Sequence, residues 1–323
     1  MSLRSCTGCA FALFATAILF CITNLHGHIA AEGETEHEHA AESQNQVSIT
    51  KRDGYMYIAA NGIPSHKVGQ FPNRRNPHTM TAQNYRYRLP MEPVMKDKIQ
   101  KDPRRVTFGI ALNGVPFDPS TAEFYRGQSQ WNYEALTGKL NLGEDMNHAH
   151  VQPSGAYHYH GLPTGLIKNL REKKNLPPDT MLLVGYAADG FPIYAQFGYI
   201  IPSDPQSGTK KLKSSYVLRK GERPDGDSTP NGTYDGTFTA DFVFVEGAGD
   251  LDQCNGRFGV TPEYPQGTYY YLLTDQFPFV PRIHRGIIDP SFIKKRMPRM
   301  RGNSDRRGSS NRAPNRSNRL PGR

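Results

Sequence analysis

Four histidines are crowded into one short stretch of the chain, residues 147–161, NHAHVQPSGAYHYHG. The whole chain of 323 residues has only 11 histidines, so 13 consecutive residues would hold fewer than one on average. Imidazole nitrogens suit Zn, Cu, Fe and Ni better than they suit Ca or Mg. The crowding therefore predicts a transition-metal site formed by His148, His150, His158 and His160.

The spacing of these histidines predicts that a β-hairpin brings them together. Side chains alternate faces along a strand, so each His-x-His pair presents both rings to the same side. Pro-Ser-Gly at 153–155 suits a three-residue loop, a type I turn closed by a left-handed glycine. This register sets His150 opposite His158 and His148 opposite His160, with Cβ atoms about 4.5–5.5 Å apart. We therefore expect all four imidazoles on one face of a His-rich hairpin.

Such a hairpin has two interpretations. Four neutral imidazoles packed together each need partners for two ring nitrogens, and protonation would bring like charges together, which a bound cation avoids. The alternative is a hydrogen-bonded hairpin of His and Tyr that only stiffens the fold. In the first case Glu144, Asp145 or Asp189 could orient a ligating ring, because carboxylates commonly fix the tautomer of a ligand histidine. In the second case these acids belong to turns.

The rest of the chain predicts a mainly β fold of the β-rich α+β type. Turn sequences such as LNGVPFDP, DGFP and YPQG divide it into short segments rich in Tyr, Phe, Val, Ile and Thr, as expected for many short strands. One segment, 163–175, carries an apolar stripe at Leu166, Ile167 and Leu170, which is typical of a helix. We expect a single compact domain over 47–295 with one or two short helices.

The two ends of the chain differ from this domain. Residues 1–30 combine Arg4, the apolar run CAFALFATAILFCI and small residues after it, the pattern of a signal peptide; an uncleaved membrane anchor is the alternative. The acidic leader 31–46 and the basic tail 296–323 lack material for a core, so both are expected to be disordered. The chain from Lys294 onward has 11 Lys and Arg against one acid, which accounts for the net charge of +9. Such a tail favours an anionic polymer or surface over specific recognition of nucleic acid.

Several motifs of this chain resemble those of the YHYH-domain family, which is named for the four residues at 157–160. The resemblance includes GAYHYHG, the preceding DMNHAH, DGFPIYA and LDQCNGRFGVTPEYPQGTYYYLLTDQFPFVPR, and it covers about 145–282. It implies an exported protein of uncharacterised function in which metal binding is suspected. Carried over residue by residue, it implies the same four histidines as ligands.

Together these features predict an exported protein, secreted, periplasmic or on the cell surface, that holds one Cu or Zn ion for binding, delivery or redox chemistry. The second interpretation is a metalloenzyme, hydrolytic or oxidative, in which three imidazoles bind the ion and the fourth ring or Asp145 handles protons. No nucleophile elbow, His-Glu-x-x-His motif or phosphate loop points to a reaction. The third is a metal-free structural module of the cell surface. Removal of the signal leaves Cys254 as the only cysteine, so no internal disulfide is expected.

Overall fold

The computed structural model describes residues 44–100 and 106–294. The predicted signal peptide, the basic tail and residues 31–43 of the predicted leader lie outside these residues. The last three leader residues, 44–46, are described, and the side chain of Asn45 donates to the carbonyl of Asn113 at 2.7 Å. No helix among the described residues combines the length and the apolar character that crossing a membrane requires.

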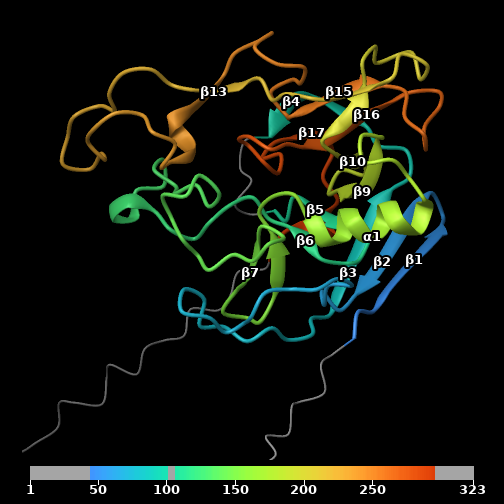
Figure 1. Ribbon diagram of the computed structural model, residues 1–323, viewed down its shortest axis with the longest axis horizontal. Coiled ribbons are helices and arrows are strands. Elements are labelled where there is room, and N and C mark those ends of the chain that lie inside the picture. The colour runs from blue at the N-terminus through green and yellow to red at the C-terminus, as the bar shows by residue number, and fades with distance from the viewer. Residues whose placement is uncertain (1–43, 101–105, 295–323) are drawn as a thin grey trace, which may run out of the picture. The chain divides into compact units, whose positions relative to one another are not determined.

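An eight-stranded mixed sheet forms the centre of the described residues (Figure 1). Its strands, in spatial order, are β15 (Gly256–Gly259), β16 (Thr268–Leu273), β10 (Pro192–Ala195), β9 (Leu182–Ala187), β5 (Gly109–Ala111), β6 (Pro116–Phe117), β8 (Tyr157–Tyr159) and β7 (Ala149–Val151). The pairs β10–β16 and β6–β8 are parallel, and the other neighbours are antiparallel. The histidine motif therefore occupies the two strands at one end of this sheet.

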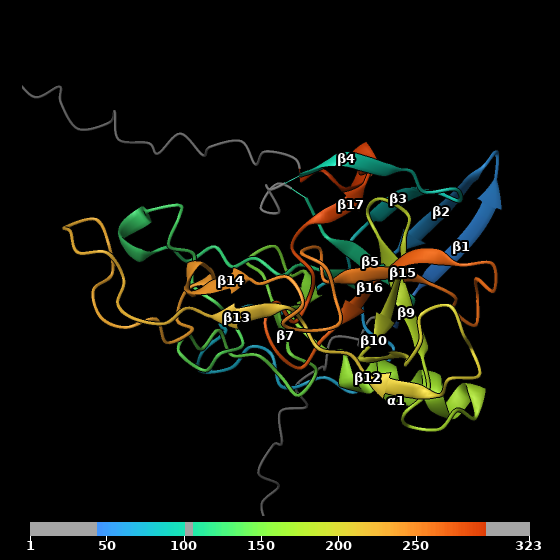
Figure 2. The same cartoon turned by 90° about the horizontal axis from the view of Figure 1, so that it is seen from above.

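A second, antiparallel sheet has the order β1–β2–β3 and consists of β1 (Val47–Arg52), β2 (Tyr55–Ala60) and β3 (Tyr85–Pro90). Three further strand pairs complete the β structure of the described residues: β11 (Phe197–Tyr199) with β12 (Thr209–Lys211), β13 (Tyr216–Leu218) with β14 (Phe242–Phe244), and β17 (His284–Gly286) with β4 (Met95–Gln100). Figure 2 shows β13 beside β14. Short 3₁₀ turns occur at Tyr125–Gly127, Thr239–Asp241 and Pro290–Phe292. The prediction of a mainly β domain with many short strands is confirmed.

Helix α1 (Thr164–Lys174) is the one α-helix of the described residues. It lies where the apolar stripe predicted it, with Leu166 buried and Ile167 and Leu170 packed against the core. Asn175 ends it in the left-handed conformation, with φ of 49°, a common helix C-terminus. The helix covers one face of the large sheet, where Leu166 packs with Leu182 of β9.

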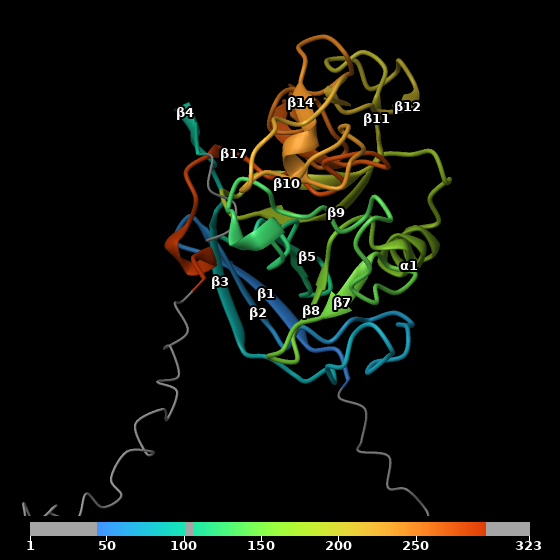
Figure 3. The ribbon, with the colours of Figure 1, turned by 90° about the vertical axis from the view of Figure 1, so that its left-hand side faces the viewer.

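The large sheet is buried on both faces because alternate residues of its strands enter different cores. In β5, Ala111 joins the core under α1, whereas Ile110 joins the core shared with β2 and β3. In β16, Tyr271 lies in the α1 core and Tyr270 in a third core on the opposite face. Figure 3 shows α1 and strands β1–β3 on either side of β5 and β8. This alternation decides which face of the sheet each side chain of the histidine hairpin can reach.

Candidate metal centre

The histidine hairpin forms with the predicted register. His150 pairs with His158 across β7 and β8, and the amide of Gln152 donates to the carbonyl of Ala156 at 2.9 Å. The loop of Pro, Ser and Gly between them closes with Gly155 at φ of 80°, the left-handed conformation that glycine adopts without strain. The predicted turn and pairing are therefore confirmed.

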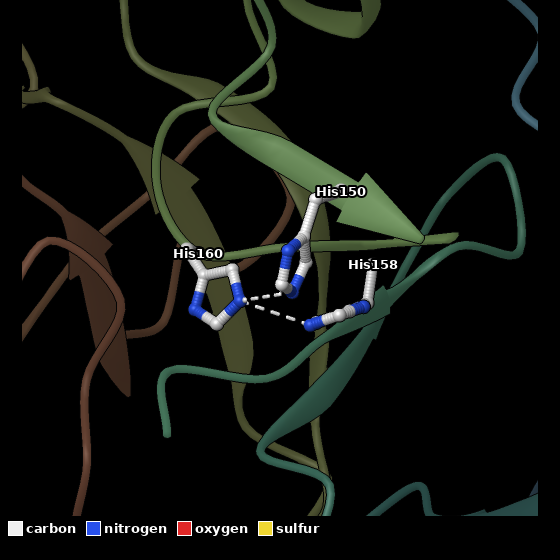
Figure 4. Close-up of side chains that lie close together, drawn as sticks. All are labelled: His150, His158 and His160. Carbon is white, nitrogen blue, oxygen red and sulfur yellow. Dashed lines mark hydrogen bonds between the residues drawn. The ribbon is translucent and has the colours of Figure 1, made fainter. Parts of the chain in front are cut away.

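Three histidine rings converge on one point above this hairpin (Figure 4). The Nε2 atom of His160 lies 2.9 Å from Nε2 of His158 and 3.2 Å from Nε2 of His150. These three residues, which we call the three-histidine cluster, each offer a ring nitrogen within 4.8 Å of the others. Among the described residues they are the only group of three or more His, Cys, Asp or Glu side chains arranged in this way.

The hydrogen bonds of the Nδ1 atoms, which point away from the centre of the cluster, bear on the tautomer of each ring and so on whether its Nε2 can accept. The Nδ1 atom of His150 lies 3.1 Å from the carbonyl of Leu142 and that of His158 lies 3.5 Å from the carbonyl of Ala156, and both contacts favour the tautomer with the proton on Nδ1. The Nδ1 atom of His150 also lies 3.3 Å from Nδ2 of Asn76, a contact that favours the other tautomer. With the proton on Nδ1, each Nε2 presents a lone pair. A proton on Nε2 of His160 can serve only one of these two lone pairs, whereas a cation serves all three rings.

Burial favours the neutral form of two rings of the cluster, those of His158 and His160. Burial lowers the pKa of His158 and of His160 well below the usual histidine value, and neighbouring histidine rings and the Lys294 ammonium lower it further. The Nδ1 atom of His160 is also buried and has no hydrogen-bond partner among the described residues. Neutral imidazole is the form that binds a metal, and burial favours this form for His158 and His160.

The fourth histidine, His148, lies outside the cluster, and the prediction that all four rings share one face is corrected. Its backbone has φ of 51°, because the chain turns there: the amide of His148 donates to the carbonyl of Asp145 at 3.0 Å. Strand β7 begins one residue later. The ring of His148 instead lies near helix α1, with Nδ1 2.8 Å from the carbonyl of Leu162.

The two acids before the hairpin have different surroundings. Glu144 lies beside His150, and its Oε2 accepts from the amide of Leu142, the residue whose carbonyl bonds the His150 ring. Asp145 serves the opposite face, where its Oδ2 accepts from the hydroxyl of Tyr157 at 2.8 Å and from the amide of Gly69 at 2.9 Å. Glu144 therefore stabilises the loop that contacts His150, while Asp145 hydrogen-bonds the face of the hairpin opposite the cluster.

Asp189 and Cys254 lie in other parts of the fold. Asp189 is fully buried and accepts from the hydroxyl of Tyr271 at 2.5 Å and from the amide of Gly286 at 2.8 Å. Cys254 is buried in the core under α1, and burial raises the pKa of its thiol to about 12. Neither residue belongs to the three-histidine cluster.

A cavity of about 550 Å³ adjoins the cluster, and we call it the histidine cavity. His150 and His158 line it together with residues that the sequence motifs did not mark, among them Asn76, Asp118 and Lys294. The Nδ2 of Asn76 donates to the carbonyl of Leu142 at 3.2 Å and to that of Val151 at 2.9 Å, so it ties a distant loop to the hairpin. The cluster thus borders this cavity on the side of His150 and His158.

The fold and the site define a β-rich domain with a cluster of three histidines, two of them buried, beside a cavity. A family model described as YHYH protein matches residues 86–286, so the chain belongs to the YHYH protein family. A search of curated proteins found no match. A search of solved structures found none either.

Proposed function

We propose that the three-histidine cluster binds one transition-metal ion, Zn or Cu, through the Nε2 atoms of His150, His158 and His160. The observation that carries this proposal is the convergence of three Nε2 atoms, with separations from His160 of 2.9 and 3.2 Å. Two nitrogens at about 2.0–2.1 Å from a tetrahedral ion lie about 3.3–3.4 Å apart. Small outward shifts of the rings would therefore admit the ion.

The donor set supports zinc or copper. Imidazole is a ligand for Zn, Cu, Fe and Ni, and the cluster has no carboxylate that would favour Ca or Mg. Three protein ligands leave a tetrahedral ion with one open position, as in catalytic zinc sites. Such an ion acts as a Lewis acid and lowers the pKa of a water bound to it.

The histidine cavity favours a metalloenzyme as the second candidate function. A site that only stores or carries an ion is usually closed by its protein ligands, while a catalytic site keeps a position for water or substrate. Here His150 and His158 face a cavity of about 550 Å³. That is large enough for a small organic ligand. Export, and contact of the basic tail with an anionic surface, stay predictions from the sequence.

Metal stoichiometry tests the proposal. The full chain is produced in medium with Zn and Cu, dialysed, and analysed for bound elements. We expect one ion per chain, and its loss in His158→Ala and His160→Ala. His148→Ala is the matched control, because His148 belongs to the same motif but its ring lies outside the cluster. A wild-type chain without metal, or equal loss in the His148→Ala variant, would overturn the proposal.

A further inference from the structure

We propose that Asp118 is the hydrogen-bond acceptor for the molecule that fills the open position of the three-histidine site. The histidine cavity would then select ligands that carry an O–H or N–H next to the atom that binds the metal. This inference rests on the proposed metal function. It adds the chemical class of ligand and the residue that recognises it.

Strand pairing places Asp118 on the same face of the sheet as the cluster. Phe117 of β6 pairs with Tyr159 of β8, and both side chains lie in the core under α1, with ring centroids 5.5 Å apart. Because successive side chains alternate, Asp118 faces the other side, as do His158 and His160. The amide of Asp118 donates to the carbonyl of Tyr159 at 3.0 Å, which holds this register. Asp118 and His158 accordingly line the same cavity.

One oxygen of Asp118 is left to accept a further hydrogen bond. The Oδ2 atom accepts from the ammonium of Lys294 at 2.6 Å. The residue is only 4% exposed, and its Oδ1 atom is buried and has no hydrogen-bond partner among the described residues. Asp241, another buried carboxylate, is satisfied by Arg223 and by backbone amides. A buried acceptor without a donor costs free energy, so the unpartnered Oδ1 of Asp118 points to a ligand that donates to it.

The position of Asp118 sets the preference between two kinds of metal ligand. An ion held by three neutral imidazoles keeps its positive charge and attracts oxygen or nitrogen donors of many kinds. A carboxylate oxygen nearby stabilises those that carry a hydrogen to donate and repels anions that only accept. Water, alcohols and hydroxamic acids belong to the first class, and azide belongs to the second.

Replacement of Asp118 by Asn is expected to reverse this preference. Lys294 only donates, so the amide oxygen of Asn would take the place of Oδ2 and the NH₂ group the place of Oδ1. The acceptor facing the ligand would become a donor. A hydrogen bond to a charged group is worth enough to change affinity by about tenfold or more. We therefore expect acetohydroxamic acid to bind about tenfold more weakly and azide about tenfold more tightly.

The test uses the full chain loaded with Co(II), whose visible spectrum reports ligands at the metal. Acetohydroxamic acid and azide are titrated into the wild type, Asp118→Asn and Asp118→Ala. The alanine variant removes the carboxylate outright and is expected, like Asp118→Asn, to weaken the binding of acetohydroxamic acid and to strengthen that of azide, so the proposal can still be tested if one variant fails to fold. Glu123→Gln is the matched control, because Glu123 lines the same cavity and its loss removes the same charge.

The ratio of the two dissociation constants decides the outcome. A ratio that changes in both Asp118 variants and stays near the wild-type value in Glu123→Gln supports the proposal. If the wild type binds one cobalt ion and the Asp118 variants keep its ratio, the role of Asp118 is refuted while the metal site stands. If the wild type binds no cobalt, both proposals fail together.

Discussion

Acid should destabilise the metal-free protein, and two buried histidines should account for a defined part of that loss. Burial lowers the pKa of His158 and of His160, whereas both rings have the usual pKa of about 6.5 in the unfolded chain. Below that pH the unfolded chain binds more protons than the folded one. Stability contributed by the neutral rings is therefore complete above pH 6.5 and falls as the pH drops toward the lower folded-state pKa.

The size of the effect follows from proton linkage. A histidine that stays neutral in the folded protein and titrates normally in the unfolded chain costs about 1.3 kcal/mol of stability between pH 7 and pH 5.5. His158 and His160 together should account for about 2–3 kcal/mol over this interval. Burial also lowers the pKa of His66 and His284, so part of the acid sensitivity is expected to persist without the cluster.

Urea denaturation followed by circular dichroism, after removal of metal by a chelator, measures this difference. Wild type and the double variant His158→Gln/His160→Gln are compared at pH 7 and pH 5.5, with His148→Gln as the control. The double variant should lose about 2–3 kcal/mol less on acidification than the wild type, and the control should behave like the wild type. Equal losses in wild type and double variant would show that His158 and His160 do not stay neutral in the folded protein.

Three further outcomes can be measured by thermal or urea denaturation. Gly155→Ala should destabilise the protein by at least about 1 kcal/mol, because Gly155 has φ of 80° and an added Cβ would lie 2.0 Å from a threonine hydroxyl; an unchanged midpoint would contradict this. Tyr159→Phe should cost about 1–3 kcal/mol, since His66 and Asn113 lose the hydroxyl they bond; a smaller loss would mean that water replaces it. Zinc at a thousand times its dissociation constant should stabilise the wild type by about 4 kcal/mol and leave His150→Ala unaffected; equal stabilisation of both would place the ion elsewhere.

The sequence predicts the hairpin well because all its determinants are local. Alternation of His and Tyr fixes the faces, and Pro-Ser-Gly at 153–155 fixes the turn, so the pairing of His150 with His158 follows from the residues alone. The helix at 164–174 is equally local, since its apolar stripe matches the face that packs on the sheet. Both elements needed no information from distant parts of the chain.

The failure at His148 has an equally local cause that the alternation pattern does not contain. The side chain of Asp145 accepts from the amide of Asn147 at 2.8 Å, and the carbonyl of Asp145 accepts from the amide of His148. This turn gives His148 a positive φ and delays the start of β7 to Ala149. An Asp two residues before an Asn is a signal for such a turn, and it outweighs the His-x-His spacing.

Asp118, Lys294 and Asn76 could not be assigned to the site from the sequence. They belong to loops that are 40 or more residues from His158 along the chain, beyond the range of any local pattern. The parallel pairing of β6 with β8 brings Asp118 beside the hairpin, and the ion pair at 2.6 Å brings Lys294 to Asp118. Residues that reach the site only through the order of strands in the sheet can be assigned to it only when that order is known.

In the Tyr-His-Tyr-His sequence that names the family, the two tyrosines and the two histidines lie on opposite faces of the hairpin. On one face the hydroxyl of Tyr157 donates to Asp145, and the hydroxyl of Tyr159 lies 2.6 Å from Nε2 of His66, so buried polar contacts fix the strand between them. On the other face His158 and His160 point into the cluster. Hydrogen bonds on the opposite face of a strand hold the ligand side chains close to the geometry that a metal ion requires. If the cluster binds a metal as proposed, loss of the Tyr157 or Tyr159 contact should therefore weaken that binding, although both hydroxyls bond residues outside the cluster.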